Sequence, residues 1–418
     1  MESSVVHPLA AVAGHGIRAE AIVTGHPRRF TLTRELRNSL VAVAAVAGLC
    51  VAAGLAVEPA RVWPGILIAS LYLVAMGLAG IFFVALQYAS GAAWSVAMRR
   101  VPEAMAAVLP FGAAGLAVVF LFHPGLYSWS GGFPGAAEGA LGFKALWLSW
   151  PFFLVRAAIY ISAWLLFSAA IVRNSRRQDE DGDSKYTLRN VRLSIGFFPV
   201  FAITVCLASF DWIMSLEPHW ASTIFGVYNF AGLFAAGLAG IIVLVVLLQK
   251  LGPRGMGPLH GVVNAEHLHD LGKLLFGFCT FWMYIWFSQY MLIWYANVSE
   301  ETAYFVTRLH GLWAPLFLLN ICLNWVLPFL VLLPRRTKRA PSVIVKVAIA
   351  VLVGRYLDLY LMVMPPLAGP SPVFGMWEGG PLLLAGATLA LVVFGALQKG
   401  AIVPLRDPLL SKSLHHHQ

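Results

Sequence analysis

Two pairs of polar side chains stand inside stretches of the sequence that are otherwise apolar. Arg156 is followed by Tyr160 four residues later, and Arg355 is followed by Asp358 three residues later. On a helix these spacings put both members of a pair on one face, where they can interact. An ionisable side chain in the middle of a membrane helix costs roughly 2.5–3.5 kcal/mol on insertion scales, so these residues are functional candidates.

Five more titratable residues flank two other apolar stretches. Asp211, Glu217 and His219 close one of them, and His267 and His269 come just before another. Histidine is the side chain that titrates near neutral pH, so we interpret the two groups as the mouths of a proton path. Residues two positions apart point away from each other on a helix, so we expect no metal site at His267 and His269.

One apolar stretch carries a stripe of polar residues, made of Asp270, Lys273, Thr280, Tyr284 and Ser288. At 100° per residue all five fall within about 80° of one another, and they span about 27 Å along a helix, nearly the thickness of the hydrocarbon core. Facing lipid, such a stripe would be strongly unfavourable, so we expect it to face protein or internal water. It predicts either a proton relay or a set of hydrogen bonds between helices.

Taken together, these residues lead to the hypothesis of two proton half-channels. The residues around position 270 would form the inner mouth, those from 211 to 219 the outer mouth, and the arginines the middle. The complete set of proton-path candidates is Arg156, Tyr160, Asp211, Glu217, His219, His267, His269, Asp270, Lys273, Thr280, Tyr284, Ser288, Arg355 and Asp358.

The composition identifies the class of protein that must position these residues. The chain of 418 residues is 59% hydrophobic and only 11% charged, with a mean hydropathy of +0.77. Soluble domains carry about 25% charged residues, so this chain belongs to another class. Continuous strand-type alternation is absent, which argues against a transmembrane barrel. The sequence therefore predicts an all-α polytopic membrane protein.

Ten apolar segments approach the roughly 20 residues that a membrane-spanning helix needs. Most of the 29 lysines and arginines fall in alternate connections, and only Arg61, Lys144 and Arg308 fall in the others. Because positive loops stay on the cytoplasmic side, we predict ten transmembrane helices with both ends in the cytoplasm. The expected parts are a tail over 1–38, a membrane domain over 39–399 and a second tail over 400–418. The segments run approximately over 39–57, 63–88, 103–122, 146–171, 192–215, 222–248, 271–296, 310–333, 343–364 and 381–396.

Motifs for a cofactor are missing from the chain. Cys50, Cys206, Cys279 and Cys322 all lie in apolar segments and form no C-x-x-C motif. Histidines stand only at segment ends, whereas a membrane haem b needs them inside helices, and no phosphate-binding G-x-x-x-x-G-K-[ST] motif occurs. The net charge of +10 arises in loops rather than in a basic domain, so no nucleic acid is expected. We expect the chain to bind no metal or redox cofactor of its own, although lipids are expected around it.

Several long sequence blocks carry a resemblance to a known family. The chain resembles the ActF subunits of bacterial alternative complex III, which belong with the NrfD and polysulfide reductase membrane subunits. The likeness in segment layout extends over about 39–399 and leaves out both tails. The blocks are 211–220 (DWIMSLEPHW), 222–228 (STIFGVY), 271–276 (LGKLLF), 287–290 (FSQY), 292–297 (LIWYAN) and 300–302 (EET).

The resemblance implies a fold and a set of partners. Spans two to five and six to nine would form two four-helix bundles, with two flanking helices. The complex oxidises menaquinol or another quinol in the cytoplasmic (inner) membrane of bacteria and passes electrons to a cytochrome c type acceptor or an oxidase. Its c-type haems and iron–sulfur clusters lie in other subunits. The implied partners are a paralogous ten-helix NrfD-like subunit, an iron–sulfur subunit, multihaem and monohaem cytochrome c subunits and small membrane subunits.

The sequence leaves several functions open. The chain could be a cofactor-free subunit that contributes a proton pathway and a scaffold, or a purely structural membrane anchor. It could be a second quinone-binding subunit, although no quinone pocket can be assigned from the residues. An autonomous secondary transporter is the alternative from another class, but the paired helix interruptions typical of such transporters are absent. The polar stripe favours the first function, since an anchor has no need to align those residues.

Overall fold

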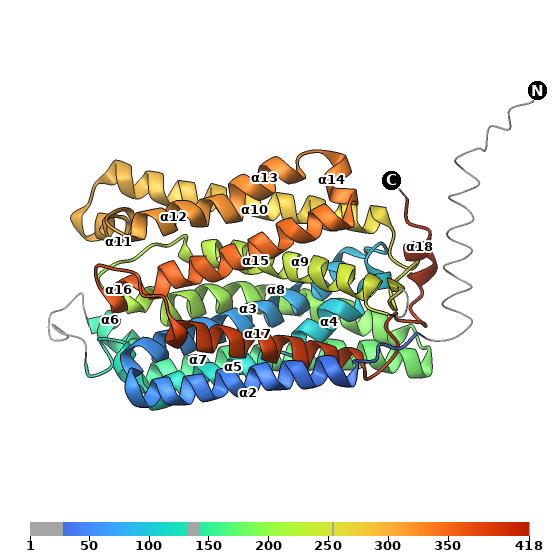
Figure 1. Ribbon diagram of the computed structural model, residues 1–418, viewed down its shortest axis with the longest axis horizontal. Coiled ribbons are helices and arrows are strands. Elements are labelled where there is room, and N and C mark those ends of the chain that lie inside the picture. The colour runs from blue at the N-terminus through green and yellow to red at the C-terminus, as the bar shows by residue number, and fades with distance from the viewer. Residues whose placement is uncertain (1–27, 133–141, 253–254, 418) are drawn as a thin grey trace, which may run out of the picture.

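The computed structural model describes residues 28–132, 142–252 and 255–417, which form a bundle of helices without a sheet (Figure 1). The predicted tail 1–38 lies mostly outside the described residues. The long helices are α2 (Arg34–Val57), α3 (Pro59–Ser90), α5 (Leu109–Phe122), α7 (Trp150–Asp181), α8 (Lys185–Trp212), α9 (Phe225–Lys250), α10 (Ala265–Ala296), α15 (Pro341–Val363) and α17 (Met376–Leu397). The shorter ones are α4 (Arg100–Ala106), α6 (Gly142–Trp147), α11 (Ser299–Leu309), α12 (Trp313–Ile321), α13 (Leu327–Leu332), α14 (Arg335–Arg339), α16 (Pro365–Ala368) and α18 (Leu410–Leu414).

Within the described ranges, nine helical segments are long and apolar enough to cross a membrane, which confirms the predicted class of helical membrane protein. In this count α4 with α5, and α12 with α13, each form one segment. Helix α15 has a comparable length of 23 residues but carries three charged residues, Lys346, Arg355 and Asp358. Charge rather than length therefore separates α15 from the other nine.

Both described ends of the chain lie at the same end of the bundle. The main-chain nitrogen of Ile402 donates to the carbonyl of Arg28 at 3.0 Å, and Arg29 forms an isolated β-bridge with Ala401. The segment before α2 and the segment after α17 therefore lie side by side. We call the end that holds Arg28, α14 and α18 the basic end, and the end that holds α6, α11 and α16 the far end (Figure 1).

Several segments differ in length from those expected. Helix α7 continues to Asp181, and helix α8 starts at Lys185. The charged residues between the predicted segments 146–171 and 192–215 are therefore mostly helical. The third segment is broken between α4 and α5, because Pro110 at the start of α5 cannot continue a helix from α4. Helix α2 starts at Arg34 because the hydroxyl of Thr33 accepts from the nitrogen of Leu36 and caps it.

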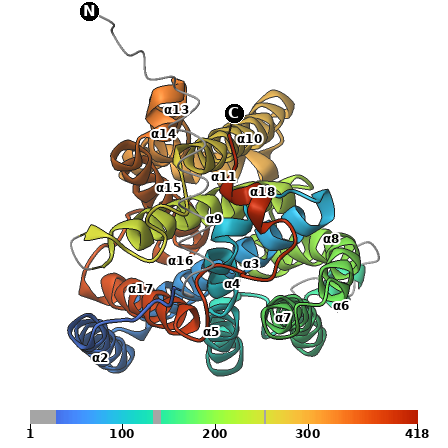
Figure 2. The same cartoon turned by 90° about the vertical axis from the view of Figure 1, so that its right-hand side faces the viewer.

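Helices α3 and α9 form the centre of the molecule. The most apolar stretch of α3 is 89% buried and that of α9 is 83% buried, far more than in the other spans. Helix α3 packs against α5, α8 and α17, and α9 packs against α10 and α15, while α3 and α9 also contact each other (Figure 2). Helices α2 and α17 pair at one side of the bundle.

A glycine allows the close contact between α3 and α4. A Cβ at Gly80 would lie 2.5 Å from the carbonyl oxygen of Pro102 and 3.0 Å from Cβ of Met105. We expect Gly80→Ala to lower the stability of the purified protein by about 1–3 kcal/mol, since backbone must move. The measurement is thermal unfolding in detergent. The matched control is Gly277→Ala, where a Cβ meets nothing within 4 Å; equal melting temperatures for the two variants would contradict the prediction.

Candidate functional site

The first buried charge cluster joins α6, α7 and α8 at the far end. Asp211, fully buried at the end of α8, accepts from Nε of Arg156 at 2.8 Å and from Nη2 of Arg156 at 2.9 Å. The indole of Trp147 donates to the same carboxylate at 2.8 Å, and the hydroxyl of Tyr160 donates at 3.1 Å. The four-residue spacing thus lets Arg156 and Tyr160 bind the same carboxylate, that of Asp211. The sequence analysis did not predict that Asp211 is their partner.

The second cluster surrounds the predicted pair on α15. Nη1 of Arg355 contacts Asp358, and Nη2 of Arg355 donates to Oδ1 of Asn229 at 3.0 Å. Asp358 also accepts from the hydroxyl of Tyr228 and from Nδ2 of Asn320, the latter at 3.0 Å. Helices α9, α12 and α15 therefore meet at one carboxylate, which is only 1% exposed.

Helix α9 makes room for the Arg355 guanidinium with a glycine. A Cβ on Gly232 would lie 2.5 Å from Nη1 of Arg355. The absence of a side chain at this position lets the guanidinium pass across α9 to reach Asn229, so Gly232 shapes the cluster as well as the packing of two helices.

The third cluster lies at the far end and contains a residue that the sequence placed in an outer connection. Arg308, which is 1% exposed, donates from Nη2 to Oε1 of Glu217 at 2.5 Å and from Nε to the carbonyl of Leu361 at 2.8 Å. Its guanidinium also lies over the ring of Tyr304, 3.5 Å from the centroid. Burial raises the pKa of the Tyr304 phenol, which therefore stays protonated. His219, by contrast, is exposed.

Two small cavities lie beside these clusters. One of about 20 Å³ touches Tyr228, Tyr304, Arg308 and Asp358, and so lies between the second and third clusters. Another of about 50 Å³ touches Arg355 and Asn229 on one side and Trp164 and Trp212 on the other, toward the first cluster. A water molecule needs about 10–15 Å³ of such space and two to four polar partners. Both cavities are large enough, and the first has the polar lining.

The charged pairs lie at different depths. Arg156 is the seventh residue of α7, and Asp358 is five residues from the end of α15, so each lies within about 9 Å of the far end of its helix. Arg355 lies deeper, about 12 Å from the same end of α15, and its guanidinium lies beside Gly232 on α9. The role of the arginines as the middle of a proton path stays a prediction. An aromatic cluster also fills this part of the bundle, in which the Phe82 ring lies 4.8 Å from that of Phe234, and Phe234 lies 4.6 Å from Phe278.

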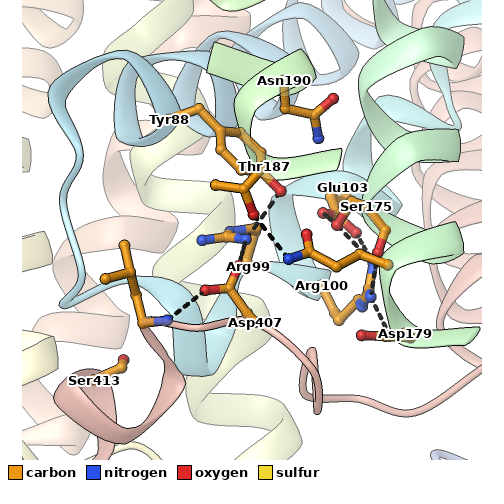
Figure 3. A network of polar contacts seen from close by, with 12 residues as sticks. Tyr88, Arg99, Arg100, Glu103, Ser175, Asp179, Thr187, Asn190, Asp407 and Ser413 are labelled. Atoms are coloured by element: carbon orange, nitrogen blue, oxygen red, sulfur yellow. Dashed lines mark hydrogen bonds and ion pairs between the residues drawn. The ribbon is translucent and has the colours of Figure 1, made fainter. Parts of the chain in front are cut away.

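A separate polar network occupies the basic end (Figure 3). Arg100 contacts the carboxylates of Glu103 and Asp179 and donates from Nη1 to the hydroxyl of Ser175 at 3.1 Å. The hydroxyl of Ser175 in turn donates to Oε1 of Glu103 at 2.5 Å. Arg100 is 5% exposed and Glu103 is 1% exposed, while the side chain of Asp179 is 21% exposed, so two helices share a largely buried triad of charges.

The carboxy-terminal segment is part of this network. Asp407 contacts Arg99, whose Nη1 also donates to the hydroxyl of Tyr88 at 3.0 Å (Figure 3). Further along, the hydroxyl of Ser413 donates to the carbonyl of Trp94 at 2.7 Å. The residues expected to form a tail over 400–418 are thus bound to the basic end of the bundle.

The residues of the predicted inner mouth lie at the start of α10. His267 is fully buried, and its ring forms a capping box with Asn264, which starts the helix. Asp270 forms an ion pair with Lys273 and a hydrogen bond with Nε2 of His416, each at 2.6 Å. His269 is also buried, at 7% exposed. These residues cap a helix and bind the carboxy-terminal segment. The aromatic cluster of Phe82, Phe234 and Phe278 lies between them and the charge clusters of the far end.

Part of the polar stripe on α10 turns away from the rest of this chain, whereas Asp270 at its start is only 6% exposed. Tyr284 is 64% exposed and the side chain of Lys273 is 45% exposed. The hydroxyl of Thr280 donates to the carbonyl of Phe276 on its own helix at 2.9 Å, and Ser288 is partly exposed. Aromatic residues on the opposite side of α10 fill the core, so the polar side turns away from it. Whether the stripe serves as a proton relay or forms hydrogen bonds between helices stays a prediction.

Residues that the sequence reasoning missed fall into two kinds. Glu103 and Arg100 repeat the i, i+3 spacing of Arg355 and Asp358, but Arg100 lies just before the predicted segment 103–122, so the pair was not considered. Arg308 and Asp407 are ionised groups in connections, where charge is ordinary. Their burial depends on partners 91 and 308 residues away, which no local pattern indicates.

Comparison with known proteins adds no relative: no protein-family model matches the chain, and no curated protein matches it. Over the described ranges, no group of three or more His, Cys, Asp or Glu residues is placed to hold a metal ion. The four cysteines are all free thiols.

Proposed function

We propose that this chain is a membrane subunit, without a redox cofactor of its own, of a bacterial quinol-oxidising complex that transfers electrons to a cytochrome c type acceptor. Support comes from the family resemblance of the blocks at 211–228 and 271–302, and from the helical membrane architecture. In this proposal ten helices cross the cytoplasmic membrane with the basic end in the cytoplasm, as the position of the lysines and arginines favours.

The observation that carries the proposal is the set of three buried charge clusters at the far end. Ionised groups at membrane depth are costly and mark proton or ion paths more often than scaffolds. Here Glu217, Asp358 and Asp211 each have a guanidinium partner, and a small cavity lies between the second and third clusters, while another lies beside the second. We infer that these residues form the outer half of a proton pathway.

Some helix contacts support the proposed division into two groups of four helices. Helix α3 contacts α5 and α8, and α7 contacts α8, which corresponds to a first four-helix group. Helix α9 contacts α10 and α15, and α12 contacts α15, which corresponds to a second. Each group contributes charged clusters, so the pathway would draw on both.

The outward polar face of α10 supports assembly with another membrane protein. The most apolar window of α10 has a mean hydropathy of 1.2, at the low end of the 1.2–2.7 found for the nine candidate spans. Lys273 and Tyr284 would face lipid in an isolated chain, which is unfavourable at this depth. A helix of the paralogous NrfD-like subunit would cover this face of α10.

Purification through this chain in a mild detergent tests the proposal. The expected result is recovery with a multihaem cytochrome, an iron–sulfur subunit and a second ten-helix protein, together with the visible absorbance of c-type haem. Recovery without partners or haem absorbance would contradict it and would favour the secondary transporter. Recovery of the complex with full proton coupling in variants of the buried clusters would instead favour a structural anchor.

A further inference from the structure

A cavity of about 380 Å³ lies at the basic end, between the end of α7 and the end of α17. Arg176 and Lys399 line its two sides, Arg100 lines it from α4, and Arg29 and Ala401 close it. The proton pathway proposed above does not use this cavity, because its clusters lie at the far end.

The cavity has an excess of positive charge. Four basic side chains (Arg29, Arg100, Arg176, Lys399) and two acidic ones (Asp179, Glu180) line it, a net charge of +2. Arg100 is paired with Asp179 and Glu103.

Three of the four cations have no carboxylate partner among the described residues. Arg176 donates to the carbonyl of Ala396 at 3.2 Å. Among the described residues, no carboxylate forms an ion pair with Arg176, Arg29 or Lys399. Guanidinium and ammonium groups grouped in this way are the usual ligands of phosphate oxygens.

An apolar surface lies farther along the span that starts with Arg100 at this cavity. Helix α5 lies at the periphery between α17 and α7 (Figure 2). Its outer face carries Phe111, Val118 and Leu121, which are 50%, 42% and 62% exposed. A Cβ on Gly112, next to Phe111, would lie 2.7 Å from the nitrogen of Val74 in the middle of α3, so this face runs from the middle of the bundle toward the far end.

We propose that the cavity binds the headgroup of an anionic phospholipid, with Arg176, Lys399 and Arg29 around the phosphate and the acyl chains along α5. A basic pocket between membrane helices, at the end of the bundle where the basic loops gather, is the kind of site that holds phosphatidylglycerol or cardiolipin. A free phosphate would contact only the cations, whereas a lipid also covers the exposed face of α5.

The test compares lipid binding to the full-length protein in detergent, by native mass spectrometry with added phosphatidylglycerol. The double variant Arg176→Gln with Lys399→Gln is expected to bind phosphatidylglycerol at least about tenfold more weakly than the wild type. The matched control is Arg173→Gln with Arg177→Gln, which removes two exposed charges of α7 that do not line the cavity and should leave binding unchanged.

Further arms separate the sources of the phosphate group. Phosphatidylcholine should bind the wild type and the double variant equally, and inorganic phosphate should not displace phosphatidylglycerol. If the double variant does not fold, Lys399→Glu alone, at an exposed position, should still weaken binding about fivefold. Equal binding of phosphatidylglycerol by the cavity variants and the control, or its displacement by inorganic phosphate, would overturn the proposal.

Discussion

Replacing Asp211 by Asn is expected to lower the stability of the protein by roughly 3–5 kcal/mol, because it leaves the buried guanidinium of Arg156 without a counter-ion. Asn has nearly the same shape as Asp, so the lost charge rather than a cavity accounts for the effect. Arg156 is 5% exposed and Asp211 is fully buried, so solvent cannot compensate. The measurement is the thermal unfolding of the purified protein in detergent.

The control is an exposed ion pair in the same chain. Asp183 lies 2.8 Å from Lys185, and both side chains are largely exposed. Exposed pairs contribute little, so Asp183→Asn should leave the melting temperature nearly unchanged. The double variant Arg156→Met with Asp211→Leu should lose less stability than the sum of its single changes, because neither charge is left alone. Equal losses for Asp211→Asn and Asp183→Asn would contradict the account of the first cluster.

A second large effect is expected at the basic end. Arg100→Met removes the cation shared by Glu103 and Asp179 and should also cost roughly 3–5 kcal/mol of stability. Glu103 has no other cation in contact among the described residues, and it is 1% exposed. Thermal unfolding again measures the loss.

A second-site change separates charge from packing in this triad. Adding Glu103→Gln to Arg100→Met removes the buried carboxylate that lost its partner, so part of the stability should return. Arg173→Met is the matched control, because Arg173 is exposed on the same end of α7. Glu103→Gln alone gives the cost of losing this carboxylate when Arg100 is present. If the same cost were added to that of Arg100→Met in the double variant, the two residues would be energetically independent, which would contradict a shared role in the triad.

The sequence predicted the class of fold because membrane helices leave a strong local signal. Long apolar segments indicate the spans, and the position of positive residues indicates which connections gather at one end. Arg28, Arg339 and Arg406 do lie at the same end of the chain fold, through contacts with His260, Glu266 and Glu180. The class of helical membrane protein is therefore confirmed, while the side of the membrane stays a prediction.

The candidate site was predictable only in part, for a physical reason. Spacing on one helix correctly paired Arg355 with Asp358, and it placed Tyr160 beside Arg156. The orientation of a helix about its own axis depends on its neighbours, and no local pattern gives it. For α10, apolar residues occur on all sides, so the sequence alone could not tell that Tyr284 and Lys273 point outward.

The most direct test of the account concerns proton transfer through the second cluster. In sealed vesicles that hold the assembled complex, quinol oxidation should move fewer protons per electron when this chain carries Asp358→Asn. Asn at this position can still accept a hydrogen bond but cannot take up a proton, and Asp183→Asn is the control. The account predicts a lower proton yield with electron transfer retained for Asp358→Asn and a wild-type yield for the control. A wild-type proton yield in an assembled, fully active Asp358→Asn complex would contradict it.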